Sequence, residues 1–334
     1  MEDIAFFEGI SYTLGLGDMK EFMPIPGGLL HQMFALYTSS GRFAVKILNS
    51  EILRRPGARE NFQKAERMEI QLARHGLPIC AALTFNGQKM QQYKQRDFYV
   101  FPYLEGKPLY PGSLNRQHCE KMGTLCAQLH SAGFQPDGFR ADLYRFDWQG
   151  LCTRASRENP ALYQQLMAQY GLLEAISKRA QKAAVRLPAH SAICHGDLDC
   201  KNVLWIGDSP QLIDLECLCR ASPWLELMES ALCFSGYESR KMEIPLLKAY
   251  LRAYYIQMKD DNRQISLDWS CIFDARTNHL AWLEYNVRRA LGEKNADAAA
   301  QAQATSQINQ TLAIIRYQET IRTQTLHTFC TVFA

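Results

Sequence analysis

Short apolar runs separated by turn residues occupy the first third of the chain, whereas apolar residues at helical spacing dominate the rest. Residues 33–37 and 42–48 lie on either side of Thr38-Ser39-Ser40-Gly41, which predicts an antiparallel hairpin. Residues 61–75 carry apolar side chains every three or four positions and predict an amphipathic helix, and a β-prone run follows at 98–101. We therefore expect an α+β fold, with an antiparallel sheet plus a helix first and a mostly helical remainder.

The helical part of the chain starts with residues 115–132. Cys119, Met122, Cys126 and Leu129 form a stripe on this predicted helix, and such a stripe is more typical of core packing than of ligands. The other predicted helices are 225–232, 244–257, 278–291 and, as a surface or linking segment, 298–304.

A second predicted hairpin carries the strongest chemical signal. Val203–Ile206 and residues 211–213 read as two short strands joined by Gly207-Asp208-Ser209-Pro210. Pairing of these strands would place Asn202, just before the first strand, opposite Asp214, just after the second. An amide oxygen and a carboxylate at one end of a hairpin suit a hard cation such as Mg²⁺, which also keeps phosphate and water ligands.

Asp197 lies on the loop that precedes this hairpin, five residues before Asn202. A carboxylate in that position can accept the proton of an incoming hydroxyl. A base next to metal-holding groups, with little covalent chemistry from the protein, is the division of labour that phosphoryl transfer requires.

The order of these residues resembles the catalytic core of the aminoglycoside phosphotransferase and choline kinase superfamily, whose members are relatives of the protein kinases. His195-Gly196-Asp197, then Asn202, then Ile213-Asp214 match the pattern of that core. Gly196 stands where protein kinases have arginine, and Leu215-Glu216 stands where they have Phe-Gly. Both differences are ordinary in the small-molecule branch and argue against a protein kinase regulated through an activation loop.

The resemblance implies a two-lobed protein-kinase-like fold and transfer of the γ-phosphate of ATP to a hydroxyl of a small molecule. Asp197 is then the base, and Asn202 and Asp214 hold Mg²⁺. In this family pattern the histidine, His195, normally holds the loop by hydrogen bonding. Glu216 either assists a second Mg²⁺ or pairs with a nearby lysine, and it ranks below Asp214.

Two further polar residues of the loop have open roles. Asp199 occupies the place where protein kinases carry a phosphate-contacting lysine. Lys201, immediately before Asn202, either contacts the γ-phosphate or braces the loop.

The N-terminal third contains segments that match the nucleotide-binding parts of the same family. The strand predicted at 42–48 contains Phe-Ala-Val-Lys-Ile, which resembles the Val-Ala-Ile-Lys strand of kinases. Ala44 and Lys46 share one face of this strand, so the alanine leaves room for adenine while the lysine reaches the phosphates. The resemblance implies that a glutamate of the following helix orients Lys46. Glu66 is the first choice and Glu69 the alternative.

Two other segments complete the expected nucleotide site. Gly27 and Gly28 occupy the place of the phosphate-covering loop, where adjacent glycines allow close backbone approach, although the full Gly-x-Gly-x-x-Gly pattern is lacking. Pro102, Tyr103 and Leu104 follow the β-prone run at a break in composition. In kinase-like folds the backbone of this hinge binds adenine.

Length and composition agree with two lobes. The chain has 334 residues, more than a typical single domain, and 47% hydrophobic residues can form substantial cores. We expect a nucleotide-binding lobe at 1–103 and a catalytic and acceptor-binding lobe at 104–334.

Charge and cysteine content limit the kinds of binding partner and metal site that we expect. A net charge of +3 without a basic tract gives no indication of nucleic-acid binding. The eleven cysteines have neither a paired framework nor a zinc-like spacing, and Cys217-x-Cys219 is too tight for a metal motif. With no long apolar run and no secretory pattern in residues 1–20, we expect a reduced cytoplasmic protein without a membrane span. Its oligomeric state is left open.

The acceptor is not identified by the sequence. A metabolic kinase for choline, ethanolamine, thiamine, a sugar or an amino-alcohol is the alternative of the same chemistry, and a catalytically silent binding protein is the alternative of another class. Trp282 and Tyr285 could line an acceptor cleft, but core packing is the favoured interpretation. A site for polycationic aminoglycosides needs several acidic groups, and the candidates are Glu226, Glu229, Glu238 and Glu284.

Overall fold

The computed structural model describes residues 2–26, 31–260, 267–293 and 297–334. The chain divides into two compact units. The first unit comprises Met1–Leu109 and His195–Cys219, and the second comprises Tyr110–Cys194 and Arg220–Ala334. Compared with the expected lobes, the first boundary lies a few residues later, and the segment that carries Asp197, Asn202 and Asp214 packs with the N-terminal residues.

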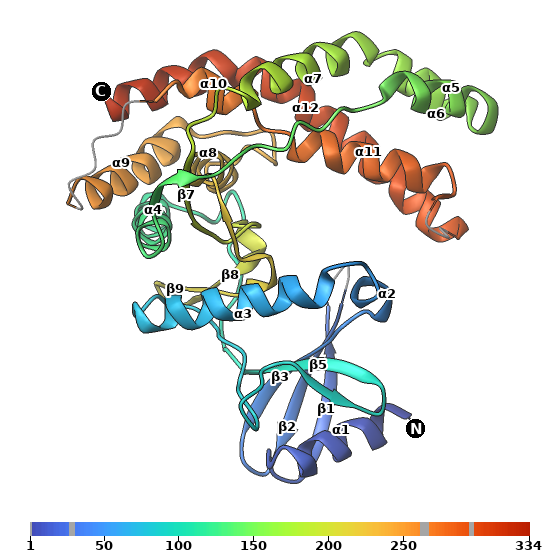
Figure 1. Cartoon of the computed structure of the whole chain (residues 1–334), viewed down its shortest axis with the longest axis vertical. Helices are drawn as coiled ribbons and strands as arrows, with labels where there is room; N and C mark the ends of the chain where they lie inside the picture. Colours follow the sequence, from blue (N-terminus) through green and yellow to red (C-terminus); the bar gives the residue numbers. More distant parts are fainter. Residues whose placement is uncertain (1, 27–30, 261–266, 294–296) are drawn as a thin grey trace. The chain divides into compact units, whose positions relative to one another are not determined.

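A five-stranded sheet is the centre of the first unit, with strand order β1-β2-β3-β5-β4 (Figure 1). Its paired strands are antiparallel, and the predicted hairpin is β2 and β3, with Met33 opposite Lys46. The strands are β1 Met19–Ile25, β2 Gln32–Thr38, β3 Arg42–Ile47, β4 Gln91–Tyr93 and β5 Arg96–Pro102. The helices are α1 Glu2–Thr13, α2 Ser50–Leu53 and α3 Ala58–Arg74.

Helices cover both faces of this sheet, and the alternation of side chains along each strand explains how (Figure 1). Phe6, Phe7 and Ile10 of α1 form one core with Val45 of β3 and with Val100 of β5. Residues one position away along β5 point to the other face, where Tyr99 packs with Phe62 of α3 in a second core. Lys46, next to Val45, therefore belongs to the face covered by α3.

The hairpin of β8 (Val203–Ile206) and β9 (Ser209–Leu212) is joined to the rest of the first unit by backbone hydrogen bonds. The Cys80 amide donates to the Leu212 carbonyl, and the Leu212 amide donates to the Pro78 carbonyl, both at 2.8 Å. On the other strand, Trp205 exchanges backbone hydrogen bonds with Lys107. These bonds explain why residues 195–219 belong to the N-terminal unit although they lie far along the chain.

The hairpin itself differs slightly from the expectation. The strands are β8 Val203–Ile206 and β9 Ser209–Leu212, with Ile206 opposite Ser209. Ser209 and Pro210 are therefore part of a strand, and the turn has only two residues. Gly207 takes the positive φ of 56° that such a tight turn needs. Short 3₁₀ turns flank the hairpin, η1 Cys200–Asn202 and η2 Leu215–Cys217.

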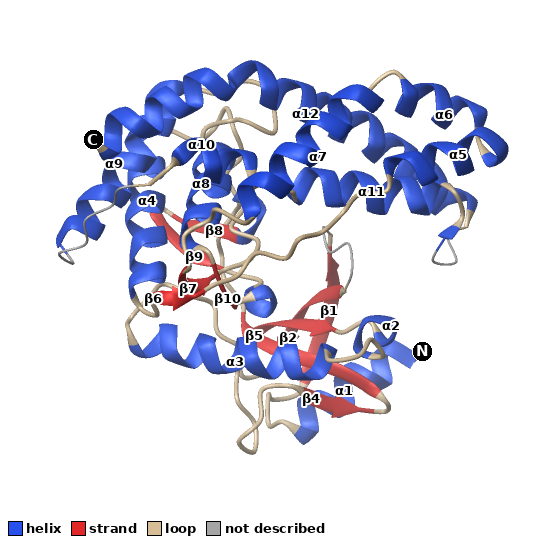
Figure 2. Cartoon of the chain, turned by 45° about the horizontal axis from the view of Figure 1, so that its top comes forward, coloured by secondary structure: helices blue, strands red, loops and turns tan. Residues whose placement is uncertain are grey.

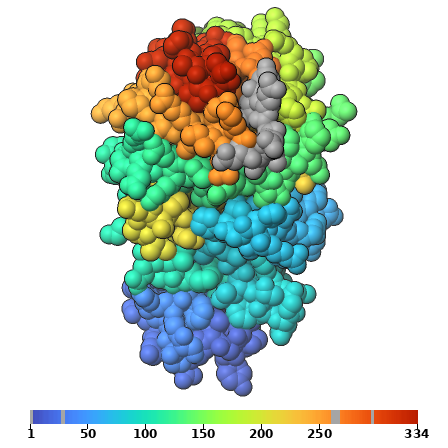
Figure 3. Space-filling view, turned by 90° about the vertical axis from the view of Figure 1, so that its left-hand side faces the viewer, coloured from blue at the N-terminus to red at the C-terminus, as the bar shows by residue number. Residues whose placement is uncertain are grey.

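The second unit is mostly helical, with a small sheet of order β10-β7-β6 (Figure 2). Helix α9 contacts both α4 and α12, and it lies between them on the face that Figure 3 shows. The helices of the second unit are α4 Arg116–Ser131, α5 Trp148–Glu158, α6 Pro160–Met167, α7 Tyr170–Ala184, α8 Pro223–Phe234, α9 Ile244–Asp260, α10 Trp269–Asp274, α11 Asn278–Ala290 and α12 Ala298–Phe333. The strands are β6 Gln135–Gly138, β7 His190–Cys194 and β10 Cys219–Ala221.

The α+β fold predicted from the sequence is confirmed, as are the helices that correspond to α3, α4, α8, α9 and α11. The segment predicted at 298–304 is only the start of α12, which continues to Phe333. Residues such as Ile308, Leu312 and Ile315 of this helix are buried in the same core as α5 and α11. No helix in the described ranges is long and apolar enough to span a membrane.

Candidate active site

The hairpin β8–β9 brings Asn202 and Asp214 to one end, as predicted. The Ile213 amide donates to the Asn202 carbonyl at 3.0 Å, which continues the ladder one step beyond the strands. Asp214 then takes a left-handed backbone conformation with φ of 60° and ψ of 52°. Aspartate tolerates this conformation better than most residues, and the chain turns there into η2. The side chain of Asp214 thus leaves the ladder at the end where Asn202 lies.

Asp197 and Asn202 are hydrogen bonded to each other. The side-chain Nδ2 of Asn202 donates to the main-chain carbonyl of Asp197 at 2.8 Å and to its Oδ2 at 2.9 Å. Both bonds use the amide nitrogen, so the oxygen Oδ1 is the atom of Asn202 suited to a cation. The Asp197 side chain keeps 43% of its surface exposed, which leaves a carboxylate accessible to a substrate.

Lys201 braces the loop in this structure. Its ammonium lies 3.2 Å from Asp197 Oδ2 and 3.2 Å from Asp199 Oδ2. Burial by itself lowers the pKa of Lys201, but the charges of Asp199 and Asp197 outweigh burial and the net shift is upward. Lys201 is therefore a cation beside the proposed base.

His195 and Gly196 shape the loop around Asp197. Nε2 of His195 donates to the carbonyl of Ile213 at 3.0 Å, which ties the loop to the residue before Asp214. This contact supports the holding role expected for His195. Gly196 has a φ of 82°, and a β-carbon on it would lie 2.4 Å from the carbonyl oxygen of Cys217. A larger residue, such as the arginine of protein kinases, does not fit at this position.

Lys46 contacts two carboxylates of the same segment. Its ammonium pairs directly with Asp214 Oδ1 and Glu216 Oε2. His31 lies on the far side of Glu216, with Nε2 3.3 Å from Oε1. The alternative in which Glu216 pairs with a lysine thus describes this structure.

The charges of this group stabilise one another. Burial alone would lower the pKa of Lys46, but the charges of Asp214 and Glu216 outweigh it and raise the pKa. For Glu216, burial alone would raise the pKa, but the hydrogen bond from His31 and the charge of Lys46 outweigh burial and lower the pKa to about 2. Lys46 and Glu216 are therefore charged together at neutral pH.

The expected partner of Lys46 differs from the one the structure shows. Glu66 accepts a hydrogen bond from the Tyr99 hydroxyl at 2.6 Å. Glu69 pairs with the ammonium of Lys89 and accepts from the Ala82 amide at 2.8 Å. Neither predicted glutamate is among the contacts of Lys46 described above, which are Asp214 and Glu216.

The structure describes some of the other residues predicted to bind the nucleotide and not others. Gly27 and Gly28 lie outside the described residues. In the predicted hinge, the Tyr103 amide donates to the Arg42 carbonyl at 3.4 Å, and the Arg42 guanidinium lies over the Tyr103 ring. The Pro102 carbonyl accepts from the Cys80 thiol at 3.8 Å. The Pro102 carbonyl can accept a second hydrogen bond, so Pro102, Tyr103 and Leu104 stay the predicted adenine contacts.

The site also contains a residue that the sequence did not indicate. His31 accepts a hydrogen bond from the Asn49 amide through Nδ1, at 3.0 Å, and it is buried. This bond, the contact with Glu216 and a ring contact with Phe62 place it beside Lys46. A single histidine after a glycine-rich turn carries no pattern from which that position follows.

The donor set fits the Mg²⁺ that the fold implies. Two carboxylates, Asp214 and Glu216, converge on the ammonium of Lys46, which shows that this place carries enough negative charge to hold a cation. The neutral oxygen of Asn202 completes an all-oxygen set at the same end of the hairpin. Hard oxygen donors of this kind are the ligands that Mg²⁺ takes in phosphate sites.

The contacts of the residues proposed to bind the acceptor differ from those expected. Glu226 is buried against His130, Glu284 pairs with Arg288, and Glu229 contacts Arg276 at 3.5 Å. The favoured core position of Trp282 is wrong, because 37% of this residue is exposed and its ring stacks on Tyr285.

The fold, together with the loop of Asp197 and the amide and carboxylate of Asn202 and Asp214 on a hairpin, is that of a phosphotransferase of the protein-kinase-like class. A profile described as the phosphotransferase enzyme family, APH, matches residues 21–264. The chain therefore belongs to this family of phosphotransferases.

Individual relatives agree with that assignment. Stress response kinase A of Salmonella paratyphi A is 27% identical over 253 residues, which cover 72% of this chain and 70% of that protein. Homoserine kinase of Nitrobacter winogradskyi is 27% identical over 200 residues, which cover 58% of this chain and 56% of that protein. The chain thus matches little more than half the length of the second relative.

Two solved structures share the fold. Spectinomycin phosphotransferase APH(9)-Ia, in complex with ADP and spectinomycin, has a TM-score of 0.69 at 13% identity, covering 95% of this chain and 98% of that chain. Choline kinase from Cryptosporidium parvum has a TM-score of 0.59 at 13% identity, covering 99% and 100%. At such identities the likeness concerns the fold alone, and it confirms the fold class expected from the sequence.

Proposed function

We propose that this protein transfers the γ-phosphate of ATP to a hydroxyl group of a small molecule. The observation that carries this proposal is the convergence of Lys46, Asn202 and Asp214 beside the accessible carboxylate of Asp197. A cation for the phosphates, oxygen ligands for a metal and a base for the acceptor are the parts that this reaction needs.

Each residue then has one role. Asp197 orients the acceptor hydroxyl and takes its proton as the oxygen forms its bond to the γ-phosphorus and the bond to ADP breaks. Lys46 places a buried positive charge against the phosphates. Asn202 and Asp214 would hold Mg²⁺, which when bound offsets the charge on the phosphate oxygens. His195 keeps the loop in place through Ile213.

The expected acceptor is a small alcohol. The relatives are named for homoserine and for a stress response, and the structural neighbours for spectinomycin and choline, so they do not converge on one acceptor. Most acidic candidates for a polycation site are engaged in internal contacts. A small amino-alcohol is therefore favoured over an aminoglycoside.

A screen for acceptor-stimulated release of ADP tests the proposal. The panel contains homoserine, choline, ethanolamine, thiamine, sugars, spectinomycin and a serine-containing peptide, each with ATP and Mg²⁺. We expect one alcohol to stimulate ADP release and to appear as a phosphate monoester by mass spectrometry. Binding of Mg²⁺–ATP without transfer to any alcohol would instead favour the catalytically silent alternative, and failure to bind nucleotide would remove the kinase function altogether.

A further inference from the structure

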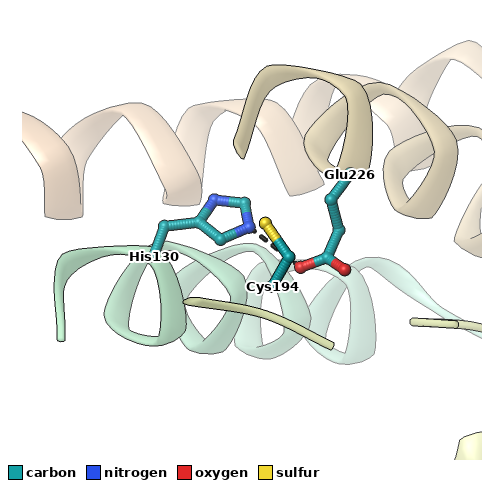
Figure 4. A group of neighbouring side chains, drawn as sticks. All are labelled: His130, Cys194 and Glu226. Atoms are coloured by element: carbon teal, nitrogen blue, oxygen red, sulfur yellow. Dashed lines mark hydrogen bonds and ion pairs between the residues drawn. The ribbon is translucent and has the colours of Figure 1, made fainter. Parts of the chain in front are cut away.

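A compact group of metal-binding side chains lies inside the second unit, apart from the residues used for catalysis. His130 comes from α4, Cys194 from the end of β7 and Glu226 from α8, and their side chains point toward one another (Figure 4). One ligand atom of each residue lies within 4.8 Å of the others. All three side chains are buried, and His130 has no exposed surface.

The spacing of the donors suits a small tetrahedral ion. A zinc ion at about 2.0–2.3 Å from nitrogen, oxygen and sulfur donors keeps those donors roughly 3.4–3.7 Å apart. His130 Nε2 lies 3.0 Å from Glu226 Oε2, and Cys126 Sγ lies 3.9 Å from the same nitrogen. Shifts of a few tenths of an ångström bring these pairs to the tetrahedral spacing. Cys126, one helical turn before His130 on α4, contacts the imidazole but is not among the three residues whose donor atoms all lie within 4.8 Å of one another.

The surroundings hold the imidazole with the correct nitrogen toward the cluster. Nδ1 of His130 lies 2.9 Å from the hydroxyl of Tyr254, so Nε2 is the nitrogen that faces Glu226 and the thiols. Cys126 Sγ in turn lies 3.9 Å from Ser230 Oγ, which is hydrogen bonded to the Tyr250 hydroxyl at 2.9 Å. Metal-ligating histidines and thiolates typically have outer partners of this kind.

Charge also favours an ion at this place. The buried carboxylate of Glu226 needs a positive charge, which the ion would supply in place of a protonated His130. A divalent ion bound by one carboxylate, one thiolate and one neutral imidazole carries no net charge. Binding releases the protons of Cys194 and His130, because thiolate and neutral imidazole are the ligating forms.

We propose that His130, Cys194 and Glu226 form a structural site for a zinc-type divalent ion. Sulfur and imidazole donors select Zn²⁺ over Mg²⁺, which prefers oxygen. The three donors are buried, so the ion is shielded from substrate and its role is to join α4, β7 and α8. The site differs from the Asn202–Asp214 site in ligand chemistry and in the metal that it takes.

Metal analysis of the full chain tests this site. The protein is produced in zinc-supplemented medium, purified without a polyhistidine tag, and its exposed Cys217 and Cys330 are alkylated so that surface thiols do not bind metal. We expect about one equivalent of zinc per chain. Production with Co²⁺ in place of zinc should give intense visible absorption of a tetrahedral ion and a thiolate-to-cobalt band in the near ultraviolet. Protein that contains no zinc and takes up no cobalt would overturn the proposal.

Substitutions of the proposed ligands test where the ion binds. Glu226→Gln keeps the shape of the side chain and removes a ligand charge, and Cys194→Ser removes the sulfur. Both should reduce the zinc content to below about a tenth of an equivalent. Cys152→Ser changes a buried cysteine in another core and should retain the metal. If the first two variants keep full zinc occupancy, the site is elsewhere. If they fail to fold, the cobalt spectrum of the wild type decides, since a tetrahedral spectrum with a thiolate band supports the site and an octahedral spectrum without one refutes it.

Discussion

Lys46 and Asp214, 168 residues apart in the sequence, form a direct ion pair in the first unit. Glu216 joins the same ammonium, and His31 lies against Glu216. The sheet that carries Lys46 and the hairpin that ends before Asp214 therefore meet at one charged group. This group is where ATP and Mg²⁺ are proposed to bind, so its charges give the most direct tests.

Replacement of Asp197 by asparagine tests the base. Asp197→Asn keeps the shape and loses the proton acceptor, and we expect turnover with the true acceptor to fall by roughly 10²–10⁴-fold. Nucleotide affinity and melting temperature should stay near the wild type. Asp208→Asn, the same change in the hairpin turn, is the matched control and should leave turnover unchanged. Near-normal turnover of Asp197→Asn would move attention to His195.

Nucleotide binding should stabilise the protein only together with the metal. A ligand at ~100 times its dissociation constant adds about 2.7 kcal/mol to the free energy of unfolding. We expect the melting temperature to rise with Mg²⁺ and ATP together and much less with either alone. Asp214→Ala should abolish most of this rise, whereas Asp197→Asn should retain it. A wild-type melting temperature that ignores Mg²⁺–ATP would contradict the proposed site.

The low pKa of Glu216 predicts how stability depends on pH. Its pKa falls from the ordinary value of 4.5 to about 2 in the folded chain. A carboxyl group with a lowered folded pKa stabilises the protein above its unfolded pKa, and this contribution is lost as the pH falls from about 4.5 toward about 2. Wild type should therefore lose stability between about pH 5 and pH 3 more steeply than Glu216→Gln. Melting temperatures of both proteins across that range check the difference, and parallel curves would exclude the predicted linkage.

Gly196 should be intolerant of a side chain. Gly196→Ala would place a β-carbon 2.4 Å from the Cys217 carbonyl at a φ of 82°, so the loop that carries Asp197 has to shift. We expect turnover to fall at least about tenfold, because small displacements of a catalytic group are costly. Gly207→Ala is the control, since Gly207 also has a positive φ but open space around it. It should cost only about 1 kcal/mol of stability and leave turnover intact. Equal effects of the two changes would show that the contact with Cys217 is unimportant.

Aminoglycosides should be poor acceptors. Polycationic substrates need free acidic groups, and Glu226, Glu229 and Glu284 are engaged with His130, Arg276 and Arg288. We expect little transfer to kanamycin-like or gentamicin-like compounds. Efficient phosphorylation of such compounds at micromolar concentration, measured by ADP release and mass spectrometry, would contradict this prediction.

The sequence by itself determined the parts whose signal is local. The hairpin around Gly207 follows from two short apolar runs and a turn, and this pairing is enough to bring Asn202 close to Asp214. Lys46 and Ala44 share a face because strand side chains alternate. Sequence patterns of this kind extend over a few residues, so they can be recognised without knowledge of the fold.

Only the tertiary structure decided which distant residues meet. Glu66 was the expected partner of Lys46, but it accepts a hydrogen bond from Tyr99, and Lys46 pairs with Asp214 and Glu216. His130 and Glu226 are 96 residues apart, and no spacing rule connects them with Cys194. Hydrophobic periodicity fixes which face of a helix or strand is buried, but it does not fix which helix covers that face. The partners of buried charged groups depend on that packing, and they therefore emerge only when the whole chain is folded.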